Sequence, residues 1–522
     1  MSSAAGFRPQ LLASAALILG MGALSGCMVG PNFVPPRPAE PSHYLSDAPA
    51  THGAPYVSGG AVDPEWWNSF QDPELTALER QAVAQNLDLQ IATQRLLEAE
   101  AQAQIEGAVL YPNLSGGASY TREGPSKVGV FAAFGSAEGT NTSAAGVANG
   151  TSTAPGGGGL SAATIAPLDL YQYGLQSTYD LDLWGKNRRA VEAAVAAAAA
   201  SEQARRASLL NVEAQVANYY LQLRGTQRVL DITRHNLAFA NQLVSLTLER
   251  QEAGLTTALD VANARATQAQ IQSQIPGLIA QRDAIIDQIG LLLGETPDDL
   301  PPALVTAAPI PATPPVVPVG LPSSLLLRRP DVREAVDNLH EMTAEVGVAE
   351  ASFFPDIALS GSVSFQALQF KNLNQFRAIT YAVGPNVTIP LFEGGQLRGQ
   401  LKLRKAQQTE AAVGYAKTVL TAFYQVNTAL VAYTQDHATV QSLKTYVQQS
   451  QIAVTLAEEQ YRQGLVDYLT VLTAQQTLLS SEQQEAQAEQ RLGTDLVTLY
   501  QALGGGWEGQ YPVTAKESAE AR

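Results

Sequence analysis

Of the 522 residues, 15% are charged and 45% belong to the hydrophobic group AVILMFWYC, against about 25% charged in an average soluble domain, which excludes a disordered polyampholyte. The 32 Lys and Arg against 48 Asp and Glu give a formal charge of −16 and leave no basic patch for a phosphate backbone, which excludes nucleic acid as a partner. One cysteine excludes an internal disulfide, and five scattered histidines are too few for a Cys/His metal cage, so we expect no metal and no cofactor.

The N-terminus is typical of an exported bacterial lipoprotein. An uncharged apolar run from Leu11 to Leu24 has roughly fourteen residues, too few to span a bilayer as a helix and the usual length for a signal peptide. It leads through Ser and Gly to Cys27, which resembles a lipobox, so we predict a diacylglycerol thioether and an amide-linked acyl chain there. Met28 follows in place of the aspartate that marks inner-membrane retention. We therefore predict a signal peptide over 1–26 and a lipidated, extended segment over 27–71, held at the outer membrane.

The mature chain is predicted to be an internal duplication. Residues 72–294 and 329–504 carry the same succession of motifs, beginning with a helix start in which proline occupies a first-turn position that needs no amide hydrogen. Two later turn glycines are separated by 210 residues (464 − 254). A repeated order of motifs indicates tandem units. The matching positions are, in pairs, Pro73 and Pro330, Gly254 and Gly464, and Gly294 and Gly504.

Three segments lie outside the repeated motifs. Residues 295–328 are rich in proline, and 300–327 carry no charged residue, which indicates an extended connector between the repeats. Residues 505–522 form a C-terminal tail. The glycine-rich stretch 124–166 occurs only in the first repeat, and we expect it to be an exposed loop.

Each repeat contains two stretches in which apolar and polar residues alternate, the period of a β-strand. They are residues 114–122, 168–183, 357–365 and 379–389. A half-buried sheet in a soluble sandwich has the same alternation, but export and lipidation favour strands that cross an outer membrane at a tilt. Because an open sheet edge in lipid leaves amides unpaired, other subunits must complete the sheet. Two chains would supply eight strands with a filled interior, whereas three would supply twelve and leave a lumen.

Long helices account for most of the remaining chain. Residues 186–253 contain no proline and only one glycine, and at 1.5 Å per residue they would extend about 100 Å. Residues 396–463 match them. Helices of that length must pack along their sides, as in a coiled coil. The helices that follow Gly254 and Gly464 return in the opposite direction, so we expect two antiparallel hairpins per chain.

Several motifs along the mature chain are specific when taken together. They are Cys27-Met28-Val29-Gly30-Pro31-Asn32-Phe33, Trp66-Trp67 with Asp72-Pro73, Leu327-Arg328-Arg329-Pro330-Asp331-Val332-Arg333, Phe353-Phe354-Pro355, Pro390-Leu391-Phe392-Glu393-Gly394-Gly395, and Tyr461-Arg462-Gln463-Gly464-Leu465 with Tyr468-Leu469-Thr470. This set resembles the NodT-like lipoprotein branch of the TolC/OprM outer-membrane efflux family. The resemblance implies a mixed α and β fold with a long antiparallel α-helical coiled-coil barrel and four transmembrane β-strands per chain. It also implies a homotrimer with a 12-stranded β-barrel and a 12-helix periplasmic tunnel.

The same resemblance implies the outer-membrane channel of a tripartite efflux system. Such a channel is a gated passive exit duct for drugs or other small organic toxicants, and it connects through a periplasmic adaptor protein to an inner-membrane RND-type pump. By the resemblance, the two hairpin turns form the adaptor-docking tip of the tunnel. The residues carried over to this tip are Ala253, Gly254, Leu255, Gln463, Gly464 and Leu465.

The resemblance also points to a gate beside the second turn. Many relatives narrow the tunnel there with acidic side chains, whereas this chain has threonines, with two aspartates nearby. The candidate gate residues are Tyr461, Arg462, Asp260, Asp467, Thr470 and Thr473.

The two enzymatic motifs that the sequence suggests are both incomplete, so we expect that the protein is not an enzyme. His340-Glu341 begins like a zinc-protease H-E-x-x-H motif, but position 344 is alanine. The glycines of 156–159 lack the G-K-[ST] sequence of a phosphate-binding loop. Two alternatives to efflux remain open, namely the exit duct of a type I protein secretion system and a lipid-anchored structural tether without a pore.

Overall fold

The computed structural model describes residues 28–36, 57–58, 63–124, 167–314, 316–319 and 328–511. Over these ranges the chain divides into two compact units. The first takes the chain up to residue 30 with 105–189 and 347–399, and the second takes 31–104, 190–346 and the chain from 400 onward. Each unit therefore combines segments of both predicted repeats. The predicted signal peptide, Cys27, the loop residues 125–166 and the tail from 512 lie outside the described residues.

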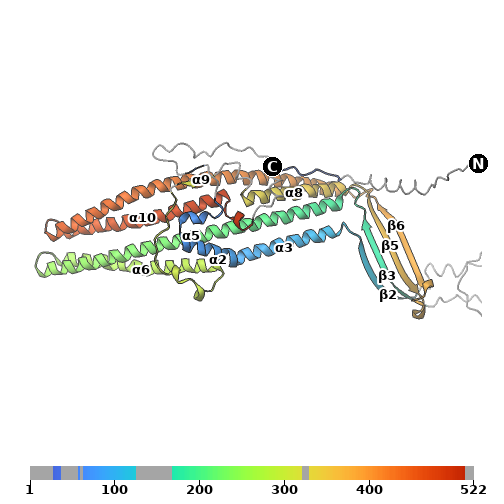
Figure 1. Ribbon diagram of the computed structural model, residues 1–522, viewed down its shortest axis with the longest axis horizontal. Coiled ribbons are helices and arrows are strands. Elements are labelled where there is room, and N and C mark those ends of the chain that lie inside the picture. Colours follow the sequence, from blue (N-terminus) through green and yellow to red (C-terminus); the bar gives the residue numbers. More distant parts are fainter. Residues whose placement is uncertain are drawn as a thin grey trace, which may run out of the picture. The chain divides into compact units, whose positions relative to one another are not determined.

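The first unit contains a sheet of four antiparallel strands, counted over the described ranges. The strands are β2 (Asn113–Glu123), β3 (Leu168–Asp180), β5 (Asp356–Ala367) and β6 (Ile379–Thr388). Their order is β2-β3-β5-β6, so β2 and β6 form the two edges (Figure 1). Each repeat supplies two of these strands, which confirms the prediction from the alternating pattern.

The second of the predicted strand ranges, 168–183, is too long at its C-terminal end. β3 stops at Asp180 because Asp182 adopts a left-handed backbone conformation, with φ of 40°. The Asp182 carboxylate then accepts hydrogen bonds from the amides of Asn187 and Arg188, at 3.0 Å each. Asp182 therefore belongs to the start of the following helix. The alternation of apolar and polar residues had no signal for this change, because Asp182 occupies a polar position of the pattern.

Seven α-helices are described in these ranges. They are α2 (Pro73–Gln85), α3 (Leu87–Ala108), α5 (Lys186–Glu252), α6 (Ala258–Leu293), α8 (Pro330–Ala351), α9 (Gln396–Arg462) and α10 (Tyr468–Leu503). The long helices α5 and α9 have 67 residues each, and α6 and α10 have 36 each. The predicted long helices end within one residue of the predicted positions.

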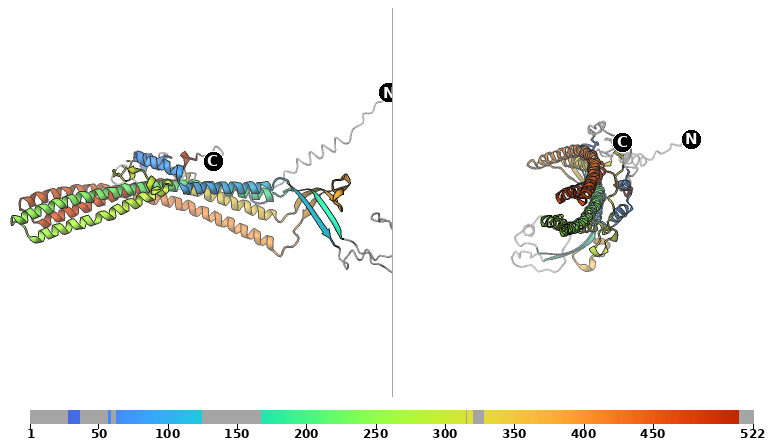
Figure 2. Two further views of the ribbon diagram at one scale, coloured as in Figure 1. Left: turned by 90° about the horizontal axis from the view of Figure 1, so that it is seen from below. Right: turned by 90° about the vertical axis from the view of Figure 1, so that its left-hand side faces the viewer.

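The long helices form two hairpins in the second unit. α5 turns into α6, and α9 turns into α10, so that each pair runs antiparallel (Figure 1). Seen along their axes, the helices of this unit follow an arc rather than a closed bundle (Figure 2). Away from the tips, α5 and α8 lie between α3 and α9, so α3 and α9 are the outer helices of the row (Figures 1 and 2).

The main hydrophobic core of the second unit joins the N-terminal segment to these helices. The short 3-10 helix Trp66–Phe70 and α2 pack their buried side chains against α5 and α10. Asp72 caps α2, since its carboxylate accepts from the amides of Glu74 and Leu75 at 2.9 and 3.2 Å. Its other oxygen accepts a hydrogen bond from the Tyr220 hydroxyl of α5 at 2.7 Å, so one residue both starts α2 and attaches it to α5.

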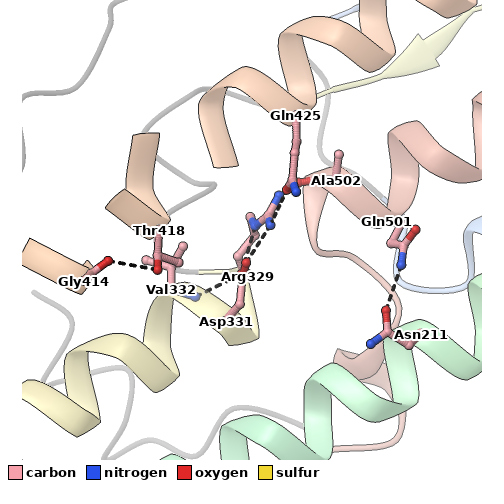
Figure 3. A network of polar contacts seen from close by, with 9 residues as sticks. All are labelled: Asn211, Arg329, Asp331, Val332, Gly414, Thr418, Gln425, Gln501 and Ala502. Carbon is pink, nitrogen blue, oxygen red and sulfur yellow. Dashed lines mark hydrogen bonds and ion pairs between the residues drawn. The ribbon is translucent and has the colours of Figure 1, made fainter. Parts of the chain in front are cut away.

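The equivalent helix start in the second repeat is built differently. α8 begins at Pro330, and the buried Arg329 guanidinium before it donates to the carbonyl of Ala502 at 2.8 Å and to the Gln425 side chain at 2.7 Å (Figure 3). It also forms an ion pair with Asp331, at 2.6 Å from Nη2 to Oδ2. The Arg-Pro-Asp motif therefore ties the start of α8 to α9 and to the end of α10.

Candidate functional site

The two hairpin turns have the same backbone geometry. Gly254 and Gly464 adopt left-handed conformations, with φ of 74° and 77°. The next residues, Leu255 and Leu465, donate their amides to carbonyls five residues back, at 2.8 and 2.9 Å. This is the arrangement by which a helix ends on glycine, because a side chain at that position would be strained. The predicted turn residues are therefore brought together within each hairpin by a matched local structure.

Both turns expose leucine side chains at matched positions. Leu255 and Leu259 are exposed beside the first turn, and Leu465 and Leu469 are exposed beside the second, each 210 residues further on (465 − 255 and 469 − 259). A Cβ placed on Gly254 would meet no heavy atom within 4 Å among the described residues. Each tip therefore presents an apolar pair next to a glycine that another chain could approach closely.

The candidate gate carboxylates cap helices at the two turns, with exchanged roles. In the first turn Thr257 is the N-cap of α6 and Asp260 is the third helical residue, and each side chain bonds the other's backbone in a capping box. In the second turn Asp467 is the N-cap of α10 and accepts from the amide and hydroxyl of Thr470, at 3.0 and 2.7 Å. In the first turn the hydroxyl residue is the N-cap and the carboxylate is the third helical residue. In the second turn the carboxylate is the N-cap and the hydroxyl residue is the third helical residue.

These hydrogen bonds hold both aspartates in the charged form. The pKa of Asp260 lies below its usual value because its carboxylate accepts from the hydroxyl of Thr256 and from the amide and hydroxyl of Thr257. The pKa of Asp467 is lowered by its bonds to Thr470. At neutral pH the partly exposed Asp260 and the exposed Asp467 are therefore negatively charged, each at a helix N-terminus whose dipole favours the charge.

An arginine that sequence analysis missed connects the two hairpins near their tips. The Arg250 guanidinium of α5 donates to the carbonyl of Tyr461 at 2.8 Å and lies 4.5 Å from the centre of the Tyr461 ring. The Tyr461 side chain is only 2% exposed and meets Tyr468 edge to face. Arg462, by contrast, points to its own helix and pairs with Glu458. The sequence signal was weak, because a basic residue near a helix end is common.

Three candidate gate residues share one groove. Asp467, Thr470 and Thr473 of α10 line a groove of about 650 Å³ beside the second turn. Residues of α9, among them Tyr446 and Ser450, form the other side. Asp260, Tyr461 and Arg462 do not line it. The groove therefore belongs to the second hairpin alone.

The sheet of the first unit has two chemically different faces. Cross-strand partners such as Tyr173 with Phe365 and Val363 with Tyr381 share one face, while Ser364 with Thr380 share the other. Side chains on the apolar face are largely exposed, so no described residue covers it. Its exposed members are Leu114, Tyr120, Leu175, Leu359, Val363, Tyr381, Val383 and Val387. A soluble monomer rarely exposes so large an apolar surface, which suits a face in contact with lipid.

The described residues contain no candidate metal site, and His340 of the incomplete H-E-x-x-H motif makes other contacts. No group of three or more His, Cys, Asp or Glu side chains in this part of the chain could hold a metal ion. His340 instead bonds Glu192 at 3.0 Å and stacks on Phe33, with ring centres 4.4 Å apart. In the same ranges, no helix has both the length and the apolar character needed to cross a membrane.

Comparisons with known proteins agree with this architecture. The sequence profile described as "Outer membrane efflux protein" matches residues 78–295 and 321–505. The chain is 32% identical over 505 residues to the probable efflux pump outer membrane protein TtgC of Pseudomonas putida, covering 96% of each protein. It is 30% identical to nodulation protein T of Rhizobium leguminosarum bv. trifolii, covering 93% of this chain and 95% of that one. The solved structure of the outer-membrane channel OprN is similar with a TM-score of 0.81 and 30% identity, covering 92% of this chain and 100% of that one.

Proposed function

Since the chain belongs to the outer membrane efflux protein family, we propose that it is the lipid-anchored, trimeric exit duct of a tripartite pump for small organic compounds. It is an efflux channel of the outer membrane. The observation that supports the duct most directly is the uncovered apolar face of a four-stranded sheet, counted over the described residues, joined in one chain to two long helical hairpins. Such a sheet needs lipid on one face and further strands at both edges.

Strand parity supports closure by identical copies. Over its described residues each chain contributes four strands to this sheet, and neighbouring strands run in opposite directions. Because the number is even, the edge strand β6 of one copy can pair antiparallel with the edge strand β2 of the next. Three copies give twelve strands, which leaves a lumen, whereas two give eight, whose interior side chains would fill. A rotationally closed ring also leaves no strand edge exposed.

The outer helices carry complementary charge for the same closure. α3, which leads into β2, has four carboxylates against one arginine. Residues 396–420 of α9, which follow β6, have five Lys and Arg against one glutamate. Both helices also expose apolar side chains, among them Ile91 and Ile105 on α3 and Val413 and Leu420 on α9. Head-to-tail packing of α9 against α3 of the next copy would bury these side chains and pair the charges.

The tips and the N-terminus supply the remaining contacts of the proposed pump. The exposed leucine pairs at the two turns, with their approachable glycines, fit the docking of a periplasmic adaptor that links the duct to an inner-membrane RND-type pump. Candidate gate residues lie beside them. Cys27, outside the described residues, would carry the lipid anchor. Relatives named for toluene, antibiotic and pyoverdine export support small organic cargo.

Three measurements test this proposal. Purified protein in planar bilayers should conduct ions in steps of uniform size, and protein that inserts but never conducts would identify a tether. Deleting the gene should raise susceptibility to organic toxicants and leave protein secretion unchanged. The reverse result would identify a protein-secretion duct. Metabolic labelling with a tagged fatty acid should label the wild type and not Cys27→Ser, and label on the variant would disprove the anchor.

A further inference from the structure

We propose that the β5–β6 hairpin end is a binding surface for phosphorylated lipid headgroups of the outer leaflet. The surface consists of Phe370, Lys371, Phe376 and Arg377, and the inference rests on the proposed membrane location of the sheet. β5 follows α8 and β6 leads into α9, so this hairpin lies at the end of the sheet opposite those two connections. With the helices in the periplasm, that end faces the outside of the cell.

The hairpin end is an ordered platform. Two single-turn 3-10 helices, Phe370–Asn372 and Phe376–Ala378, are closed by backbone hydrogen bonds of 2.9 to 3.2 Å. Leu373 between them is buried. Tyr173 of β3 donates its hydroxyl to the Asn374 side chain at 2.9 Å. The side chains around these contacts are therefore displayed from a defined backbone.

The platform is locally basic in an acidic protein. Residues 368–378 contain Lys371 and Arg377 and no carboxylate, while the whole chain has a formal charge of −16. Both cations are exposed, and neither forms a hydrogen bond or an ion pair with any described residue. Two unpaired cations on one hairpin end therefore remain available for an anionic partner.

Aromatic side chains indicate that this partner belongs to a lipid. Phe376 is 88% exposed and Phe370 is 72% exposed, and each is followed directly by one of the cations. Phe370 meets Tyr171 edge to face, and Tyr171 contacts Tyr120, so the platform continues an aromatic band on the apolar face of the sheet. Aromatic rings at headgroup depth with adjacent cations are the arrangement by which membrane proteins hold anionic lipid. Free phosphate would make no use of the exposed rings.

Binding of a phosphorylated glycolipid to purified trimers in detergent provides the test. The probe is diphosphoryl lipid A, compared with its dephosphorylated form and with inorganic phosphate, and bound lipid is counted by native mass spectrometry. We expect the wild type to prefer diphosphoryl lipid A. Lys371→Gln with Arg377→Gln should weaken this binding by about tenfold or more, because each cation near an anionic headgroup contributes independently. Phe376→Ser should weaken binding of both lipid forms.

A matched control separates this surface from general charge effects. Arg234→Gln with Arg265→Gln removes two exposed cations from α5 and α6, and this pair should bind lipid as the wild type does. Equal lipid binding by the Lys371/Arg377 pair and the wild type, or equal binding of lipid A and inorganic phosphate, would overturn the inference. If conductance in bilayers is normal in either case, the channel assignment stands and only the lipid surface fails.

Discussion

At the scale of single residues, two buried glutamates set an unusual condition on the core. Glu79 of α2 and Glu213 of α5 are fully buried, and none of their four carboxylate oxygens has a hydrogen-bond donor among the described residues. Burial, and then the Glu213 charge, raises the pKa of Glu79 well above its usual 4.5. Burial, and then Glu508, raises the pKa of Glu213. Both carboxyls therefore hold a proton to higher pH in the folded protein than a solvated glutamate does.

This pair predicts that the protein loses stability as pH rises. A raised folded-state pKa means that the folded chain binds more protons, so the stabilisation is complete below pH 4.5 and is lost as pH rises through the folded pKa. Glu79→Gln keeps the shape of the side chain but removes its charge. At alkaline pH we expect it to be more stable than the wild type by about 2 kcal/mol, with a flatter dependence of Tm on pH. Thermal unfolding across a pH series measures this.

The control for the glutamate pair lies on α5, the helix that carries Glu213. Glu249→Gln alters an exposed carboxyl of α5 and should follow the wild-type pH profile. If Glu79→Gln lost as much stability on alkalinisation as the wild type, the pair would not hold a proton.

Arg329 gives a second prediction at this scale. Its guanidinium contacts Ala502, Gln425 and Asp331 together, so Arg329→Ala would leave the buried Ala502 carbonyl without its donor and would remove the contacts with the more exposed Gln425 and Asp331 side chains. We expect a loss of about 3 kcal/mol in unfolding free energy. Arg329→Lys should recover only part, because an ammonium cannot reproduce the planar geometry. Denaturant unfolding measures both, with exposed Arg234→Ala as control, and a loss equal to the control's would contradict the tie.

At the scale of elements, local patterns predicted most of the fold. Period-two alternation and proline-free runs are signals carried by neighbouring residues, so four strands and the long helices could be predicted. Pro276 lies inside α6, so the return helix predicted after Gly254 continues past a residue that disfavours helix interiors. Packing of the surrounding helix overrides a local preference of that kind. The predicted turn residues likewise follow from glycine and helix-cap chemistry.

Contacts between distant segments could not be predicted in this way. Arg250 and Tyr461 meet across 211 positions, and no local pattern specifies that pairing. The contact between Glu79 and Glu213 could not be predicted either, because glutamate is rarely fully buried. Such sites depend on which elements lie close together, and these distances cannot be read from a single sequence.

The link between the hairpins predicts a change in gating. Arg250→Ala removes the hydrogen bond to the Tyr461 carbonyl and the contact with its ring. The α5–α6 hairpin should then move more freely against the end of α9, and we expect a larger fraction of open time in planar bilayers. Arg265→Ala, an exposed change on α6, serves as control. Unchanged open time in Arg250→Ala would show that this contact does not restrain the tips.

The leucine pairs predict how the tips bind. Leu255→Asp with Leu465→Asp places charges on the proposed docking surface, and both positions are exposed, so stability should change little. Crosslinking to the adaptor should fall strongly while trimers persist. Leu291→Asp alters an equally exposed leucine elsewhere on α6. Loss of crosslinking in that control as well would remove the tips from the docking surface.

At the scale of the whole molecule, charge should govern assembly. Glu98 and Glu100 precede β2 by 15 and 13 residues, and Lys402 and Lys405 follow β6 by 14 and 17, so they lie at similar distances from the strands that would pair. Lys402→Glu with Lys405→Glu should weaken the trimer, more at low salt than at high salt. Adding Glu98→Lys and Glu100→Lys should restore it. Native mass spectrometry in detergent measures the oligomer, with Arg234→Glu and Arg265→Glu as the matched charge change.

The exchanged capping pairs also constrain how the two halves of the gene can recombine. The first half encodes Thr257 before Asp260, and the second encodes Asp467 before Thr470. A crossover inside this four-codon window would yield two carboxylates in one product and two hydroxyls in the other, and neither reproduces the original bond. Selection against both products would keep the halves distinct here, even where gene conversion makes the surrounding codons alike.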